Sequence, residues 1–196
     1  MSTNSPPLPP WPDTPPRHGR VLLRAVTEQD VPMARDLSTD PYVPATGSLP
    51  ARATPSQARA WVRRQQRRHA EGSGFSFTIA VAATGRAVGH CGLWLREFGA
   101  GRASAGYALA PSARGKGLAV DALTALTHFA WTVPGLFRIA LYIEPANHAS
   151  IRTAEAAGYL REGLLRSHQE IAGRRRDMVL YAAVRPSGTS AGAPVA

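Results

Sequence analysis

The chain has 196 residues and a mass of 20.9 kDa, a size typical of one domain, and its 44% of hydrophobic residues suffice for a packed core. No run approaches the roughly 18 apolar residues of a membrane-spanning helix, which excludes an integral membrane protein of that kind. The net charge is +10, with 23 Lys and Arg against 13 Asp and Glu, and Lys116 is the one lysine. This balance favours an anionic partner, although the arginine excess also fits GC-rich codon usage and a solvated surface.

The two ends of the chain have the composition of unstructured segments. Residues 1–16 hold seven of the 17 prolines and lack the basic and apolar regions of a secretory signal, so we expect a disordered, Pro-rich leader. Residues 185–196 predict a disordered tail, which leaves 17–184 as a single domain. The one cysteine, Cys91, excludes an internal disulfide and lies in an apolar run typical of a buried thiol; we expect a cytoplasmic protein.

The predicted elements follow the chain in the order β-α-α-β-β-β-α-β-α-β-β. A first strand over 21–26 leads into a helix that continues to Leu37. The second helix has the strongest start signal, because Thr54 can cap it, Pro55 fits the first helical position and Gln57 completes a capping box. The later elements are strands over 75–82, 87–95 and 104–110, a helix over 117–131, a strand over 137–143, a helix over 147–157, and strands over 159–168 and 176–184.

Most of these strands follow one another through short turns, which favours antiparallel pairing. Only the middle of the chain has a strand–helix–strand pattern, which favours one parallel pair. We therefore expect an α+β domain with a central mixed, mostly antiparallel sheet of about seven strands flanked by about four helices.

A glycine-rich turn between a predicted strand and a predicted helix, residues 106–119, is the most informative stretch. Glycines let backbone N–H groups approach a ligand, and the helix N-terminus adds unpaired N–H groups with a partial positive charge. Together these features predict an anion site suited to a phosphate or a pyrophosphate.

Three phosphate-binding patterns compete for this turn. The P-loop pattern fails because Gly117 follows Lys116 where Ser or Thr is required, and the first glycine is absent. The dinucleotide pattern G-x-G-x-x-G fails because Val120 stands in place of the third glycine. The pattern [RQ]-x-x-G-x-[GA] is matched in full by residues 114–119, RGKGLA.

Further motifs lie in register with this hexapeptide. Gly106-Tyr107 and Pro111 precede it, Asn147-x-x-Ser150 follows it, and the chain continues with AAGY at 156–159 and G-x-x-x-D-x-x-x-Y at 173–181. In this order the motifs resemble the GNAT family of acyl-CoA-dependent N-acetyltransferases, and in particular its RimJ/RimL-like branch. The resemblance covers residues 20–184 and implies the GNAT fold.

The resemblance implies acetyl-CoA as co-substrate. Backbone amides of residues 115–119 would hold the pyrophosphate, aided by the side chains of Arg114 and Lys116. The pantetheine arm would lie between the strands that end near Ala110 and begin near Phe137, and Asn147 would hold it. The implied coenzyme-binding residues are Tyr107, Leu109, Arg114, Gly115, Lys116, Gly117, Leu118, Ala119 and Asn147. No metal is expected, because His90 and His128 lack partners at metal-ligand spacing.

The family resemblance also implies direct attack of a substrate amine on the thioester in a ternary complex, with no acyl-enzyme. Ser150 is then the candidate general acid that protonates the departing thiolate, as in RimL-like relatives. A second interpretation makes Ser150 a first-turn serine that bonds the helix cap at Asn147, and both roles are compatible.

The general base is less defined. RimL-like relatives carry a Glu where this chain has Gln169, and Glu170 beside it faces the opposite side of the strand. His168 shares the side of Glu170 and titrates in a useful range. We predict Glu170, His168 or a chain of waters as the proton acceptor, with Glu144 at the end of an earlier strand as a second candidate.

Five arginines crowd the second predicted helix: Arg59, Arg63, Arg64, Arg67 and Arg68. They are interpreted as a solvated face, as a docking surface for an acidic macromolecule, or as part of an acceptor pocket for an amine that bears a carboxylate or a phosphate. The acceptor stays open between a protein N-terminal α-amine, as on ribosomal proteins, and a small-molecule amine such as an antibiotic. The oligomeric state stays open between a monomer and a homodimer.

Two other functions compete with the enzyme. A non-catalytic acyl-CoA-binding module is one, because the expected acid on the penultimate strand is shifted. A basic nucleic-acid-associated protein is the other, although the chain has no helix-turn-helix, no aromatic RNA-binding signature and no zinc spacing. We therefore expect neither a membrane nor a nucleic acid as a direct partner.

Overall fold

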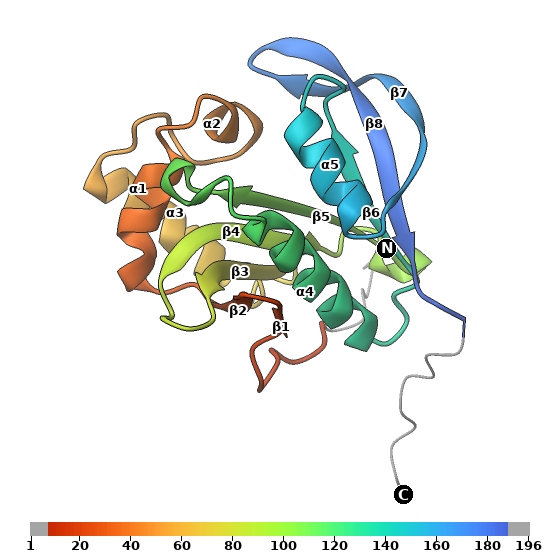
Figure 1. Cartoon of the computed structure of the whole chain (residues 1–196), viewed down its shortest axis with the longest axis horizontal. Coiled ribbons are helices and arrows are strands. Elements are labelled where there is room, and N and C mark those ends of the chain that lie inside the picture. The colour runs from red at the N-terminus through yellow and green to blue at the C-terminus, as the bar shows by residue number, and fades with distance from the viewer. Residues whose placement is uncertain (1–7, 188–196) are drawn as a thin grey trace, which may run out of the picture.

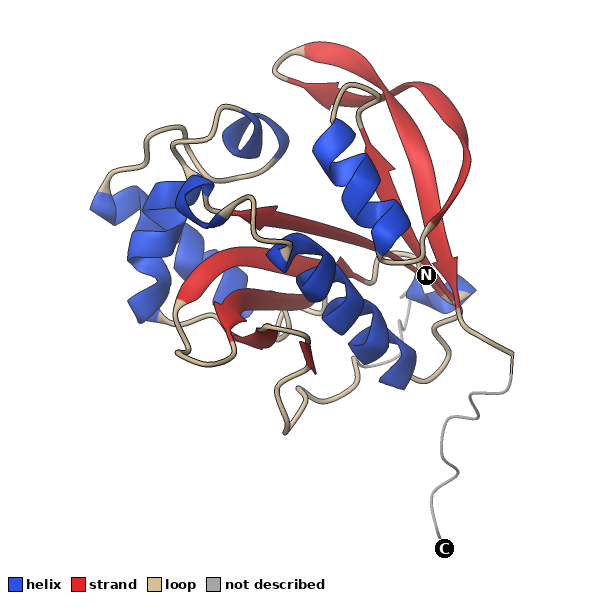
Figure 2. Ribbon diagram, viewed as in Figure 1, coloured by secondary structure: helices blue, strands red, loops and turns tan. Residues whose placement is uncertain are grey.

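A single eight-stranded sheet organises the computed structural model of the chain, which describes residues 8–187. The strand order is β1-β2-β3-β4-β5-β6-β8-β7, and every neighbouring pair is antiparallel except β5 and β6. Figure 1 shows the elements in chain order and Figure 2 separates helices from strands.

The strands are β1 (Arg17–His18), β2 (Val21–Ala25), β3 (Gly74–Val81), β4 (Ala87–Trp94), β5 (Arg102–Leu109), β6 (Arg138–Ile143), β7 (Leu160–Ile171) and β8 (Arg174–Val184). The α-helices are α1 (Val31–Leu37), α2 (Tyr42–Thr46), α3 (Pro55–Arg67), α4 (Leu118–Thr132) and α5 (His148–Ala156).

This architecture confirms the predicted α+β fold with a mixed, mostly antiparallel sheet. The described residues contain one strand and one α-helix more than expected: the two-residue strand β1 and the five-residue helix α2. Both are too short to produce a hydrophobic period, and α2 lies inside a segment, 40–50, whose prolines and glycine are typical of a loop. None of the helices in the described part of the chain is long and apolar enough to cross a bilayer.

Helices cover both faces of the sheet, and each face has its own hydrophobic cluster. On one face α4 packs over the strands, with Phe75, Phe77 and Leu126 in the cluster. On the other face α1 and α3 pack together around Leu37 and Trp61. Strand β3 is buried on both sides because it lies between the two clusters.

The segment before the sheet packs onto the domain. The Trp11 indole lies 4.7 Å from the Phe77 ring centroid and 5.7 Å from that of Phe75, and His69 Nε2 is 2.8 Å from the Pro9 carbonyl oxygen. Because a large aromatic side chain gains much by burial, this contact corrects the expectation of a disordered leader for residues 8–12. Residues 1–7 of the expected leader and residues 188–196 of the expected tail lie outside the described residues.

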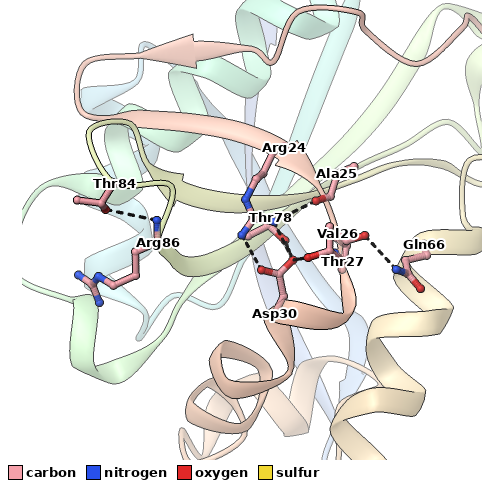
Figure 3. A network of polar contacts seen from close by, with 9 residues as sticks. All are labelled: Arg24, Ala25, Val26, Thr27, Asp30, Gln66, Thr78, Thr84 and Arg86. Carbon is pink, nitrogen blue, oxygen red and sulfur yellow. Dashed lines mark hydrogen bonds and ion pairs between the residues drawn. The ribbon is translucent and has the colours of Figure 1, made fainter.

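A buried carboxylate joins strands β2 and β3 to the start of helix α1 (Figure 3). The fully buried Asp30 accepts hydrogen bonds from Arg24 at 2.7 Å, from the Thr78 hydroxyl at 2.7 Å and from the Thr27 amide at 2.8 Å. Burial by itself raises the pKa of Asp30, but the bonds from Arg24, Thr27 and Thr78 outweigh it and hold the pKa below its ordinary 3.8. The ionised carboxylate therefore joins β2, β3 and the start of α1.

We expect Asp30→Asn to lower the free energy of unfolding by about 2–3 kcal/mol near neutral pH, because it removes the charge that satisfies Arg24. The folded-state pKa of Asp30 lies below the unfolded value, so this stability is present above about pH 4 and is lost as the pH falls through the folded-state pKa. Urea unfolding from about pH 7 to about pH 3 measures both effects. The exposed Asp13→Asn serves as control, and an Asp30→Asn protein with wild-type stability and the same acid dependence would contradict the role.

Candidate functional site

The two central strands β5 and β6 separate along their length. Their parallel pairing covers only Arg102 to Ser104 against Arg138 to Ala140. Beyond Ala140, strand β6 continues its pairing with β8, while β5 continues with β4. In the described part of the chain no strand pairs with the β6-facing edge of residues 105–109. A cleft of about 1150 Å³ opens at this divergence.

The glycine-rich turn forms one wall of the cleft. Gly115 and Gly117 have φ angles of +77° and +70°, which a residue with a Cβ adopts only with strain. Helix α4 starts directly after this turn, so the free N–H groups of its first residues, Leu118 and Ala119, lie at the cleft. Eight of the nine sequence-predicted coenzyme residues, all except Lys116, therefore line the cleft. Left-handed glycines before a helix start are typical of a turn whose backbone amides bind an anion.

Arg114, also in this turn, is engaged by the protein. Its guanidinium forms a 2.6 Å ion pair with Asp40 and donates to the Leu109 carbonyl at 3.1 Å. Asp40 also accepts the Tyr42 and Val43 amides that begin α2, at 2.7 and 2.9 Å. Burial alone raises the pKa of Asp40, but these amide bonds and Arg114 hold it below the ordinary value. Arg114 therefore connects the glycine-rich turn to α2.

Lys116 lies between Gly115 and Gly117, which line the cleft, but it is not itself one of the lining residues. Its backbone carbonyl accepts a hydrogen bond from Arg20, which also forms an ion pair with Asp121 in the first turn of α4, at 3.5 Å. A Cβ on Gly117 would stand 3.1 Å from the Arg20 guanidinium. Arg20 is thus a cation beside the turn that sequence reasoning missed, because it comes from the β1–β2 turn far away in the sequence.

The start of α5 brings three predicted residues together. The Asn147 side chain caps the helix by accepting the Ser150 amide at 3.1 Å. The Tyr107 hydroxyl donates to the Ser150 carbonyl at 3.2 Å, and burial raises the pKa of Tyr107. The Tyr107 side chain also forms a hydrogen bond with the side chain of Ser150, which opposes the effect of burial on the pKa of Tyr107. Asn147, Ser150 and Tyr107 all line the cleft.

The candidate bases differ in whether they line the cleft. Glu170 and His168 are exposed and do not line the cleft, and the His168 ring stacks on Tyr142 at 4.8 Å. Gln169 between them lines the cleft, because alternate residues of a strand face opposite sides. The sequence predicted that Gln169 faces the opposite side from Glu170 and His168. It proposed the latter two as proton acceptors, and these are the two that do not line the cleft.

Glu144, the second candidate, does line the cleft. Its carboxylate is largely buried, with 17% of the side chain exposed, and lies 3.6 Å from Arg176. Tyr42 of α2 faces it: burial first, and then the negative charge of Glu144, raise the pKa of Tyr42 to about 12. The side chain of Glu144 thus lies at the cleft between α2 and the end of β6.

A second group of cleft residues comes from α3 and β4. His90 Nε2 lies 2.8 Å from the Ser76 hydroxyl, which donates to Gln65 at 3.1 Å. Burial, and then the charge of Arg68, lower the pKa of His90 to about 3, so this ring is neutral. The Trp94 indole lies close against Gly106, where a Cβ would be 2.9 Å away. The sequence allowed Trp94 as a core or pocket-wall residue and Arg68 as part of an acceptor pocket, but it did not predict that His90 lies with them, because this requires the pairing of distant elements.

The remaining candidate groups do not add a reactive centre. Cys91 is fully buried, as its apolar surroundings predicted, and burial raises the pKa of its thiol. Within residues 8–187, no three His, Cys, Asp or Glu side chains gather in a way that could hold a metal ion.

Comparison with known proteins identifies the family. A family model described as an acetyltransferase (GNAT) domain matches residues 20–160. The match covers well over half of the chain, so the chain belongs to the GNAT family of acetyltransferases and is an acyltransferase. Members of this family use acetyl-CoA as the acetyl donor.

Individual relatives agree with this family and with its RimJ/RimL-like branch. The p20 protein of Bacillus licheniformis, described as an uncharacterized N-acetyltransferase, is 30% identical over 85% of this chain and 93% of its own. RimJ of Mycobacterium smegmatis, solved with a CoA-disulfide, is 26% identical with a TM-score of 0.76 over 89% of this chain and 88% of its own. RimL, a ribosomal α-N-protein acetyltransferase solved with coenzyme A, shares the fold at 23% identity and a TM-score of 0.72, over 86% and 96% of the two chains.

We expect Gly117→Ala to weaken coenzyme A binding about fivefold or more, because a Cβ makes the left-handed conformation cost roughly 1–2 kcal/mol. Titration calorimetry with coenzyme A measures the effect. Gly99→Ala is the matched control, since Gly99 has no positive φ and open space around its Cβ position. Equal affinities of both variants and the wild type would show that the turn does not hold the coenzyme.

Proposed function

We propose that the protein is an N-acetyltransferase that moves an acetyl group from acetyl-CoA to a primary amine by direct attack in a ternary complex. The observation that carries this proposal is the divergence of β5 and β6 directly beside a turn that presents backbone amides to an anion. An open strand edge next to a phosphate-binding turn suits a ligand with a long amide-containing arm attached to a pyrophosphate.

In this proposal the pyrophosphate lies on the amides of residues 115–119, and the pantetheine arm runs along the open edge of β5. Tyr107 and Leu109 supply backbone groups there, and Asn147 holds the arm from α5. The geometry leaves Arg114 a supporting role through Asp40, and Lys116 a role by charge alone. Most of the binding then depends on the backbone rather than on cationic side chains.

Transfer requires a neutral amine, a stabilised oxyanion and a proton for the leaving thiolate. The amine nitrogen attacks the thioester carbonyl, and a backbone N–H on the open edge of β5 stabilises the oxyanion. The carbon–sulfur bond then breaks, and the Ser150 hydroxyl gives its proton to the coenzyme A thiolate. In place of Glu170, Glu144 accepts the amine proton through water, because Glu144 is the carboxylate that lines the cleft beside α2.

Ser150→Ala should lower kcat about 10- to 100-fold with little change in KM for acetyl-CoA, because the general acid is lost while Asn147 still caps α5. Ser150→Thr keeps a hydroxyl and should recover most of the rate. Release of free thiol from acetyl-CoA measures both variants. If Ser150→Ala were as fast as the wild type, the serine would have only a structural role.

Glu144→Gln should lower kcat/KM about tenfold or more and shift the pH–rate profile, because the proton acceptor is lost. Glu170→Gln is the control, since its exposed carboxylate does not line the cleft, and we expect it to keep the wild-type profile. The same thiol assay over a range of pH decides between the two. An altered profile in Glu170→Gln alone would reverse the assignment.

The activity itself is tested with a panel of amines: ribosomal-protein N-terminal peptides, amino acids, polyamines and aminoglycosides. We expect free thiol to be released with at least one class, and acetylated product to be found by mass spectrometry. The panel separates a protein α-amine from a small-molecule amine as acceptor. Coenzyme A binding without turnover on any amine would favour a non-catalytic acyl-CoA-binding module.

A further inference from the structure

The structure divides the five arginines of the second predicted helix into two groups. Four have partners at the surface: Arg59 and Arg63 lie 3.3 and 3.1 Å from Glu28, Arg67 lies 3.0 Å from Glu71, and Arg64 donates to the Ser48 carbonyl at 2.9 Å. Arg68 at the end of α3 differs from these four. Within residues 8–187 no carboxylate lies within 4.0 Å of its guanidinium and no group accepts a hydrogen bond from it.

Arg68 is directed into the cleft by an aromatic side chain. Its guanidinium carbon lies 5.7 Å from the centre of the Trp94 ring, and both residues line the cleft. Trp94 in turn lies against the backbone at Gly106, so the indole has a fixed support. A cation–π contact of this kind orients a guanidinium but leaves its donors and its charge free for an anion.

The charges around Arg68 make an anionic ligand favourable there. Burial first, and then the positive charge of Arg96, lower the pKa of Arg68, and Glu71, which opposes them, is already paired with Arg67. The neighbouring His90 ring is neutral and adds no compensating charge. A partly desolvated guanidinium without a carboxylate is costly, and a ligand oxyanion would offset that cost.

We propose that Arg68 and Trp94 form an acceptor subsite that binds a carboxylate or phosphate group of the amine substrate. This inference rests on the proposed function and names its substrate class: amines that carry an anionic group, in preference to polyamines and aminoglycosides. Glu144 directly follows β6, and Trp94 lies on β4 on the other side of the gap between β5 and β6. The amine and the anion are therefore drawn toward opposite walls of the cleft. Trp94 supplies an apolar surface for the part of the acceptor between them.

The test uses pairs of acceptors that share an amine and differ in charge: β-alanine with β-alaninamide, and aminopropyl phosphate with aminopropanol. The wild type should acetylate the anionic member with a kcat/KM about tenfold or more higher. Arg68→Gln should abolish this preference mainly through KM, and Arg68→Lys should retain part of it. Arg67→Gln, on the same helix but paired at the surface, should keep it in full.

The two pairs of acceptors also distinguish the two anions. Preference for the anionic member of the β-alanine pair alone identifies a carboxylate site, and preference for that of the aminopropyl phosphate pair alone identifies a phosphate site. No anionic preference in the wild type, or an equal preference in Arg68→Gln, would overturn the subsite. Thermal unfolding checks that the variants fold; if Arg68→Gln does not, Arg68→Lys carries the test through its partial loss of preference.

Calorimetric binding of the same acceptors to the coenzyme A-loaded protein separates this inference from the proposed function. Binding that favours the anion and depends on Arg68, without any acetylation, would support the subsite while contradicting the enzyme. Acetylation of amines without anionic preference would support the enzyme while contradicting the subsite.

Discussion

The early end of the β5–β6 pairing is the constraint on which the rest of the site depends. Backbone N–H and C=O groups in a protein interior need partners, and a strand edge without one is a place where another chain or a ligand can add. Here β6 is drawn away after Ala140 by its ladder with β8, and β5 is held by β4. The gap is therefore built into the sheet by two competing pairings, so it does not depend on a flexible loop.

The contact between Arg114 and Asp40 makes the two ends of the cleft interdependent. Asp40 accepts the first two amides of α2, and this helix contributes Tyr42 to the wall near Glu144. Arg114 belongs to the glycine-rich turn. A side chain that would otherwise be free to contact phosphate is thus used to position α2. In the proposed function, the turn therefore binds the pyrophosphate through its left-handed glycines and the start of α4, which carry no formal charge.

Local signals predicted the parts of the molecule that depend on neighbouring residues. The capping box of Thr54 and Gln57 forms as expected, and the RGKGLA turn ends a strand and begins a helix. Non-local contacts account for what sequence reasoning missed. The alternation at 168–170 was visible in the sequence, but which side faces the cleft depends on how β7 pairs with β8. Helix α2 and strand β1 are too short to leave a period.

The arginine-rich helix shows why net charge is a weak guide to function in this chain. Sequence alone treats its five cations alike, because the partner of two of them, Glu28, precedes the helix by about thirty residues and meets it only through the packing of α1 on α3. Once those pairs form, most of the charge on this helix is balanced or solvated and contributes little free energy. Arg68 differs from the other four arginines in its environment. It is partly buried, it is supported by Trp94, and no carboxylate of residues 8–187 lies within 4.0 Å of its guanidinium. A recognition site therefore depends on where a charge lacks a partner, and the excess of +10 by itself does not locate it.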